Sequence, residues 1–231
     1  AIVANPRQAS ALTSLAYLLM RKGDVSEAKL KAEQSYEADP FLENANLTLW
    51  RLVQTSWELD DDIELRRHCG EGQRRFPDYY RFWQCKLMWF AMAGETADIP
   101  AAWSDLEGFV ERTPPPLQES GRKRGEMYIA MGLARIAGDG SGALADSARS
   151  VALRGRASAE VDPVRELALL ESVVRTSLGE YDEAVRLLGI YIAANPSFRE
   201  AYRESAKAGT LRWYLADLVG QPAFRRLVGV Q

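Results

Sequence analysis

The chain has 231 residues, of which 47% are hydrophobic and 26% are charged, a composition typical of a globular protein of one or two domains. Its formal net charge of −3 gives no overall positive field to attract nucleic acid, so we expect none to bind this segment. No apolar run is long enough to cross a bilayer, and we expect no membrane insertion.

The first six residues read like the end of a helical hairpin. Residues 2–6 have the sequence Ile-Val-Ala-Asn-Pro, and residues 192–196 have the sequence Ile-Ala-Ala-Asn-Pro. We therefore interpret residues 1–6 as the tail of a preceding repeat and expect the chain to be a piece of a longer protein. We recognise no signal peptide and expect a cytoplasmic location.

Two stretches far apart in the chain share one spacing of residues. Counted from Gly23, positions +5, +9, +12 and +17 hold Ala28, Ala32, Ser35 and Pro40. Counted from Gly179, the same positions hold Ala184, Leu188, Tyr191 and Pro196. The glycine can end one helix, acidic residues after it favour the start of a second, and the proline stops that second helix. This unit of helix, turn, helix and proline, with a period of about 34 residues, resembles the tetratricopeptide repeat.

The resemblance implies an all-α fold, a right-handed superhelical solenoid of antiparallel helix hairpins that ends in C-terminal capping helices. The expected hairpins are residues 7–40, 42–77, 78–114, 117–155 and 163–196, and the capping helices lie in residues 197–231. A solenoid end needs a cap over its apolar face. We assign to this cap Trp213, Tyr214, Leu218, Phe224 and Leu227.

The second hairpin has acidic residues where the others have a glycine turn. Asp60, Asp61 and Asp62 are adjacent, and we favour a helix N-cap over a cation site. Cys69 and Cys85 both lie in predicted helices, and we favour buried, reduced thiols over a disulfide.

The fourth hairpin is degenerate. Counted from Gly138, its packing positions hold the small residues Ala143, Ser147 and Ser150. The glycines of residues 138–142 suggest a phosphate loop, but no strand precedes them and no Gly-Lys-Ser/Thr follows, so we predict a turn between helices.

The first helix of the fifth hairpin fits the repeat only after a shift of one residue. The shifted pattern buries Leu167, Leu170, Val174 and Leu178. The unshifted pattern would bury Glu171 and Arg175, which is costly.

Catalytic patterns are weak in this sequence. His68 is the only histidine, it has no second ligand at metal spacing, and no Ser-His or Cys-His pattern surrounds it. Dinucleotide and phosphate-loop motifs are absent in their required context. We therefore expect a protein that is not an enzyme and that needs no cofactor and no metal.

In the tetratricopeptide family the first helices of the hairpins line a concave groove. Transfer of the groove positions to this sequence predicts a ligand-binding set made of Tyr17, Arg21, Trp50, Gln54, Trp57, Gln84, Met88, Tyr128 and Arg135. Aromatic residues, Met and Arg suit recognition. For Trp50 and Trp57 the alternative of packing between repeats stays open.

The resemblance implies a non-catalytic scaffold that binds a protein or peptide in its groove. The alternative is a regulatory or sensor module that controls an upstream kinase, cyclase or DNA-binding domain of the same chain. It rests on residues 215–229, LADLVGQPAFRRLVG, which resemble the C-terminal ends of bacterial repeat arrays in signalling proteins.

Overall fold

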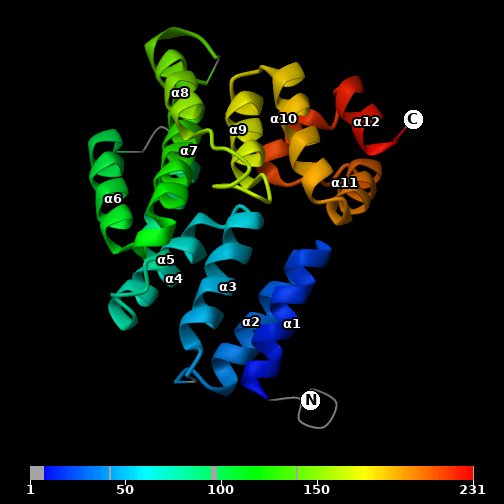
Figure 1. The fold of residues 1–231 in the computed structure, drawn as a ribbon. Coiled ribbons are helices and arrows are strands. Elements are labelled where there is room, and N and C mark those ends of the chain that lie inside the picture. The colour runs from blue at the N-terminus through cyan, green and yellow to red at the C-terminus, as the bar shows by residue number, and fades with distance from the viewer. Residues whose placement is uncertain (1–7, 42, 95–97, 139, 231) are drawn as a thin grey trace. The chain divides into compact units, whose positions relative to one another are not determined.

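The computed structural model describes residues 8–41, 43–94, 98–138 and 140–230, and helices are the regular secondary structure of these residues (Figure 1). The predicted repeat tail at residues 1–6 lies outside the described residues. The α-helices of the first half are α1 (Ala9–Lys22), α2 (Val25–Ala38), α3 (Ala45–Glu58), α4 (Asp62–Arg75), α5 (Arg81–Ala93) and α6 (Ile99–Arg112). The second half contains η2 (Pro115–Leu117), α7 (Gln118–Ala137), α8 (Gly142–Gly155), α9 (Glu166–Ser177), α10 (Tyr181–Ala194), α11 (Ser197–Ala208), η3 (Trp213–Leu218) and α12 (Pro222–Val228).

The chain divides into two compact units, residues 1–89 and residues 90–231. In the first unit α1 packs against α2 and α3, and α3 packs against α4. In the second unit α7 packs against α6, α8 and α9, and α9 packs against α10 and η3. Helices that follow one another in the chain thus pair, as the predicted all-α hairpins require. The boundary between the units falls inside α5, within the third predicted hairpin.

Three hairpin turns have the same backbone form. Gly23 has a φ of 98°, Gly179 has a φ of 73°, and Asp60 occupies the equivalent position with a φ of 58°. In each turn this residue donates its N–H to the carbonyl three residues back, and the next residue donates to the carbonyl five residues back. These bonds satisfy the carbonyls that a helix end leaves without partners.

The acidic turn of the second hairpin works as a helix cap. A carboxylate oxygen of Asp61 accepts the N–H of Glu64 at 3.1 Å, and the other oxygen lies 2.8 Å from Nζ of Lys29. Both oxygens therefore have partners within the fold, and the predicted N-cap is confirmed.

The residues at the repeated spacing are buried in four hairpins. These residues are Ala28, Ala32 and Ser35; Leu65, Cys69 and Gly72; Ala102, Leu106 and Phe109; and Ala184, Leu188 and Tyr191. Small side chains among them let helices approach closely, because a Cβ atom added at Gly72 would lie 2.3 Å from the Phe82 ring.

A short chain of buried hydroxyl groups joins α1, α2 and α3. Oγ of Ser35 donates to the carbonyl of Ala9 at 2.7 Å. Oγ1 of Thr13 lies 2.8 Å from Oγ of Ser35 and 2.7 Å from Oγ1 of Thr48. Each of these buried hydroxyls thus has a partner, which offsets the cost of removing it from water.

In the fourth hairpin the prediction was wrong by two residues. Ala143, Ser147 and Ser150 are exposed, whereas Ala145, Ala148 and Ala152 are buried. Counted from Gly140 instead of Gly138, the positions +5 and +12 fall on Ala145 and Ala152. Gly140 has a φ of 72°, and a Cβ atom added there would lie 2.3 Å from the Leu178 carbonyl oxygen. Gly138, Gly140 and Ser141 lie between α7 and α8, as predicted for a turn between helices.

In the fifth hairpin both alternative faces of α9 are buried. The predicted set Leu167, Leu170, Val174 and Leu178 is buried, and so are Glu171 and Arg175. We expected the cost of burying these two charges to keep Glu171 and Arg175 out of the packed face, and this expectation was wrong.

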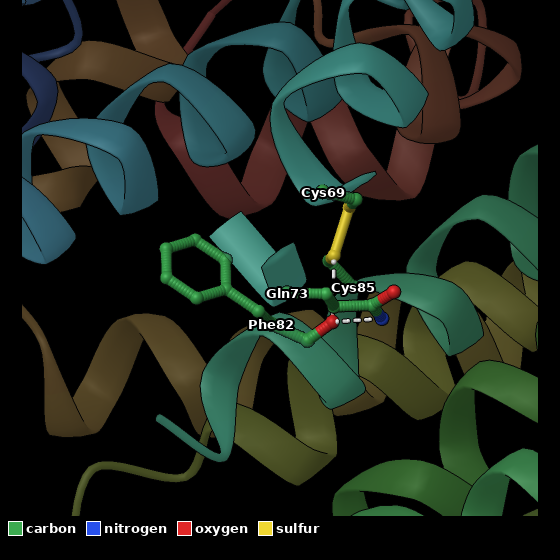
Figure 2. Close-up of a disulfide and its surroundings, with 4 residues drawn as sticks. All are labelled: Cys69, Gln73, Phe82 and Cys85. Atoms are coloured by element: carbon green, nitrogen blue, oxygen red, sulfur yellow. Dashed lines mark hydrogen bonds between the residues drawn. A yellow bond between two sulfur atoms is a disulfide. The ribbon is translucent and has the colours of Figure 1, made fainter. Parts of the chain in front are cut away.

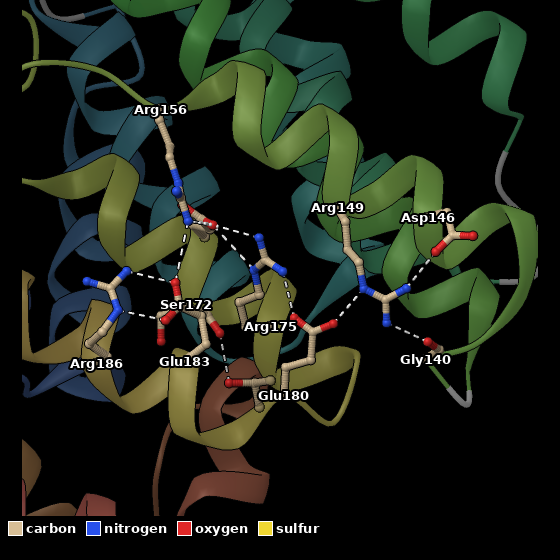
Figure 3. Close-up of polar contacts among 11 residues, drawn as sticks. Gly140, Asp146, Arg149, Arg156, Ser172, Arg175, Glu180, Glu183 and Arg186 are labelled. Atoms are coloured by element: carbon tan, nitrogen blue, oxygen red, sulfur yellow. Dashed lines mark hydrogen bonds and ion pairs between the residues drawn. The ribbon is translucent and has the colours of Figure 1, made fainter.

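The charged pair is buried because other charges compensate it (Figure 3). Nε and Nη2 of Arg156 each donate to a carboxylate oxygen of Glu171 at 2.6 Å. Nη2 of Arg175 lies 3.0 Å from Glu171, and its Nη1 lies 2.6 Å from Glu180. Arg149 donates to Glu180 at 2.5 Å, which extends the network to α8. A buried ion pair is tolerated where such hydrogen bonds complete it.

The expectation of reduced cysteines was also wrong. Cys69 of α4 and Cys85 of α5 form a disulfide, with their Cα atoms 6.0 Å apart (Figure 2). Nε2 of Gln73 donates to the carbonyl of Phe82 at 2.6 Å and ties the same two helices together. Two buried cysteines on paired helices can face each other at a distance that a disulfide spans, and spacing in the sequence does not show this.

The C-terminal elements cover apolar residues of the second unit. Tyr214, Leu218 and Phe224 are buried, and Trp213 and Leu227 are half-buried. Helix α12 packs against α10 and α11, and η3 packs against α9. These contacts agree with the expected capping segment.

The close contact at Gly72 can be tested with a pair of substitutions in α4. Gly72→Ala places a methyl group against the fully buried Phe82 ring and should destabilise the fold by about 1–3 kcal/mol. Gly70→Ala, in open space on the same helix, should stabilise it by about 0.5–1 kcal/mol. Urea unfolding measures both, and equal effects of the two changes would contradict the close contact.

The role of the cap can be tested by deletion of residues 197–231. The shortened chain should aggregate or dimerise, because apolar residues of α9 and α10 lose their cover. Analytical ultracentrifugation and thermal melting, with a chain that lacks only residues 229–231 as control, measure the effect. A monomer with an unchanged melting temperature would show that the segment is not a cap.

Candidate functional site

The structure divides the nine predicted groove residues by their exposure. Tyr17 and Arg21 are exposed, and Gln54 and Arg135 are half-buried. The buried members are Trp50, Trp57, Gln84, Met88 and Tyr128, each with 3–6% of its surface exposed. Burial of Trp50 and Trp57 agrees with the alternative left open above, in which they pack inside the fold.

In the second unit, Arg135 of α7 lies over an aromatic ring of the C-terminal segment. Its guanidinium carbon is 4.7 Å from the centre of the Trp213 ring. A guanidinium over an indole face is a favourable cation–π contact. Arg135 therefore contributes to holding η3 in place.

In the first unit, Tyr17 and Gln54 meet at Arg51, a residue that the groove positions did not include. The Arg51 guanidinium carbon lies 4.5 Å from the centre of the Tyr17 ring. Nη1 of Arg51 also donates to Oε1 of Gln54. Arg51 thus joins the exposed ring of α1 to the amide of α3.

A second arginine lies near enough for its charge to act on Arg51. Arg81, the first residue of α5, has its guanidinium carbon 5.5 Å from the centre of the Trp50 ring and 5.7 Å from that of Tyr80. The Trp50 ring in turn meets Phe82 edge to face, with centres 6.4 Å apart. We name Tyr17, Trp50, Arg51, Tyr79 and Arg81 the arginine–aromatic surface. Tyr79 belongs to it because the charges of both arginines act on its hydroxyl, and the buried Trp50 ring lies under Arg81.

The two arginines of this surface influence each other. Burial lowers the pKa of the Arg51 guanidinium, and the positive charge of Arg81 lowers it further. Burial raises the pKa of the Tyr79 hydroxyl, although Arg81 and Arg51 both oppose that change. An arginine stays protonated in proteins despite such shifts, so two positive charges are held close together here.

Within the described part of the chain, neither Arg51 nor Arg81 forms an ion pair with a carboxylate. Arg67 and Arg75 of the same unit differ, since Arg67 pairs with Glu64 and Arg75 with Glu71. Partly desolvated positive charges without a counter-charge raise the free energy of the unbound protein. An anion placed between them would relieve this repulsion and gain charge-assisted hydrogen bonds.

The sequence held a signal for this surface that spacing alone did not reveal. Arg51 follows Trp50 directly, and Arg81 follows Tyr79 and Tyr80. An aromatic residue beside an arginine in two neighbouring hairpins is a pattern suited to cation–π contacts. The groove positions excluded Arg51 because they were transferred from a family pattern rather than from the charges present.

His68 is buried, with 3% of its surface exposed. Its Nε2 lies 3.3 Å from a carboxylate oxygen of Glu64, and its Nδ1 has no hydrogen-bond partner among the described residues. The described residues contain no group of three or more His, Cys, Asp or Glu side chains arranged to hold a metal ion.

Comparison with known proteins adds no assignment, because no family model, no curated protein and no solved structure matches this chain. Across the residues described, no helix combines the length and the hydropathy that a membrane span requires.

Stability should depend on pH through His68. Burial, helped by the charge of Arg67, lowers its pKa from the ordinary value of 6.5 to about 4. Between these values the unfolded chain binds a proton that the folded chain does not bind. The free energy of unfolding should therefore be fully retained above pH 6.5 and fall by about 3 kcal/mol down to pH 4.

The non-titrating variant His68→Gln isolates this effect from the carboxylates that titrate in the same range. Urea unfolding from pH 7 to pH 4 gives the free energy of unfolding of both proteins. The value for the unchanged protein minus the value for the variant should decrease as the pH falls. A constant difference over this range would contradict the burial of a neutral His68.

Proposed function

We propose that this protein is a non-catalytic helical-repeat module of the tetratricopeptide type that binds a protein or peptide. The repeated spacing supports the proposal, together with the common turn geometry at Gly23, Asp60 and Gly179. The observation that carries the binding function is the pair Arg51 and Arg81, which lie among aromatic rings without a carboxylate partner in the described residues.

The chemistry of the surface defines the partner that fits it. Arg51 and Arg81 favour a carboxylate, either of an acidic side chain or of a chain terminus. Tyr17, with 41% of its surface exposed, offers an aromatic face to an apolar side chain of the same partner. We therefore propose an acidic segment that contains apolar residues as the ligand.

Such a segment can belong to a separate protein or to another part of the same full-length chain. The second case is the regulatory alternative, in which an upstream kinase, cyclase or DNA-binding domain is controlled through this surface. Both cases use the same recognition by Arg51 and Arg81, and they differ in whether the bound segment is covalently connected.

The cellular compartment in which the protein works is also a matter of proposal. The sequence led us to expect a cytoplasmic location, but the disulfide between Cys69 and Cys85 weakens that expectation. Disulfides persist in oxidising compartments, whereas the cytosol keeps most thiols reduced.

The proposal predicts that removal of one arginine weakens binding without weakening the fold. Peptides that carry two acidic residues beside a leucine or phenylalanine, with free and with amidated C-termini, serve as probes in fluorescence anisotropy. Arg51→Gln should weaken their binding by about tenfold, the typical size of one lost charge-assisted hydrogen bond. Raising the salt concentration should weaken binding in the same direction.

The matched control is Arg74→Gln, which makes the same change of net charge at an exposed position of α4. It should bind the peptides like the unchanged protein. Arg51→Gln should change the melting temperature little, because relief of the repulsion from Arg81 offsets the lost contacts with Tyr17 and Gln54. Equal weakening by both variants, or failure of every acidic peptide to bind, would contradict the proposal.

A further inference from the structure

A pocket with a volume of about 270 Å³ lies in the second unit, outside the surface described above. Three arginines line it: Arg156 and Arg165 from the connection between α8 and α9, and Arg186 from α10. Leu187 and Ile190 of α10 contribute apolar wall. A small pocket that combines apolar wall with convergent charged groups has the form of a small-molecule site.

Two of the three arginines are neutralised by carboxylates of the fold, as Figure 3 shows. Arg156 donates to both carboxylate oxygens of Glu171 at 2.6 Å. Nε and Nη2 of Arg186 donate to the two oxygens of Glu183 at 2.6 and 2.7 Å. Their charges are therefore balanced before any ligand arrives.

The other acidic residue of the pocket wall is occupied as well. The two carboxylate oxygens of Asp162 accept the N–H groups of Glu166 and Leu167 at 3.0 and 2.8 Å. Asp162 thus caps the start of α9, and these two amide groups are not available to a ligand. It makes no ion pair with Arg165 among the described residues.

Arg165 is consequently the arginine of this pocket whose guanidinium has neither an ion pair nor a hydrogen bond within the described residues. Its backbone is unusual too, with a φ of 56° and a ψ of 31°, in the left-handed region that glycine and asparagine favour. Strained backbone of this kind is found at functional sites, where the surrounding structure imposes it.

The backbone role of this position does not require an arginine. The carbonyl of Arg165 accepts the N–H groups of Ala168 and Leu169 at 3.2 and 3.3 Å, and so begins the hydrogen bonding of α9. Glycine or asparagine could perform this task with less strain. Helix initiation therefore does not account for an arginine side chain at this position.

We propose that this pocket binds one carboxylate group that carries a small apolar substituent, with Arg165 as its anchor. The Asp162 carboxylate is held by the N-terminus of α9, which leaves the Arg165 guanidinium for a ligand, and this planar group matches the two oxygens of a carboxylate. Leu187 and Ile190 receive the apolar substituent. The same chemistry occurs in a free small carboxylic acid and in the C-terminal residue of a peptide. This site is independent of the function proposed for the arginine–aromatic surface.

The test uses the full chain and two pairs of probes. Isovalerate represents the free acid, and N-acetylleucine represents a peptide C-terminus. Isovaleramide and N-acetylleucinamide have the same shapes without the charge. Chemical shifts of backbone amides in residues 165–168 and 187–190, followed during titration, locate and measure binding.

At least one of the two acids should shift these amides in a saturable way, while its amide should bind about tenfold more weakly or not at all. Binding of isovalerate identifies the free acid as a ligand, and binding of N-acetylleucine alone identifies a peptide terminus. If neither acid binds, or if the amides bind as tightly as the acids, the proposal is overturned.

Two variants assign the binding to Arg165. Arg165→Gly and Arg165→Asn should each weaken acid binding by about tenfold or more. The melting temperature should be unchanged or higher, because both residues accept the left-handed backbone. Arg226→Ala, at an exposed position of α12, makes the same charge change and should bind the acids normally. Normal binding by both Arg165 variants would overturn the assignment.

Discussion

Three helical hairpins of this protein depend on one backbone constraint, a single residue in the left-handed conformation at the turn. This residue reverses the chain and lets its N–H and the next one bind the last carbonyls of the first helix. Gly23 and Gly179 adopt the conformation at little cost, and Asp60 adopts it as one of the few other residues that tolerate it. The spacing of buried residues in the second helix follows from this starting point, because position +5 is the first to face the neighbouring helix.

This constraint explains which parts of the fold could be predicted from the sequence. Where one residue alone could form the turn, the buried positions followed correctly, as with Ala28 and Ala184. The fourth hairpin has three glycines with positive φ near its turn, Gly138, Gly140 and Gly142, and local sequence does not decide among them. Only a glycine fits at position 140, where an added Cβ atom would lie 2.3 Å from the carbonyl oxygen of Leu178, a residue of another hairpin.

The burial of charged residues was even harder to predict from local sequence. Burial of Glu171 could not be expected from its own helix, because the guanidinium that compensates it belongs to Arg156, in the connection before that helix. Arg51, Arg81 and Arg165 show the opposite case, a charge that the fold does not compensate. No carboxylate of the described residues forms an ion pair with them. Candidate binding residues in this protein are thus identified by what the fold fails to neutralise, a property of the folded chain rather than of any motif.

The buried hydroxyl chain of the first unit has a direction. The only hydroxyl hydrogen of Ser35 is donated to the Ala9 carbonyl. Thr13 must therefore donate to Ser35, and Thr48 must donate to Thr13. Each hydroxyl hydrogen is therefore ordered, and the three groups are not equivalent. Loss of the Thr48 hydroxyl removes only the group that donates to Thr13. Loss of the Ser35 hydroxyl removes both the acceptor of the Thr13 hydrogen and the side-chain donor to the Ala9 carbonyl. Evolutionary drift should accordingly be freer at position 48 than at position 35.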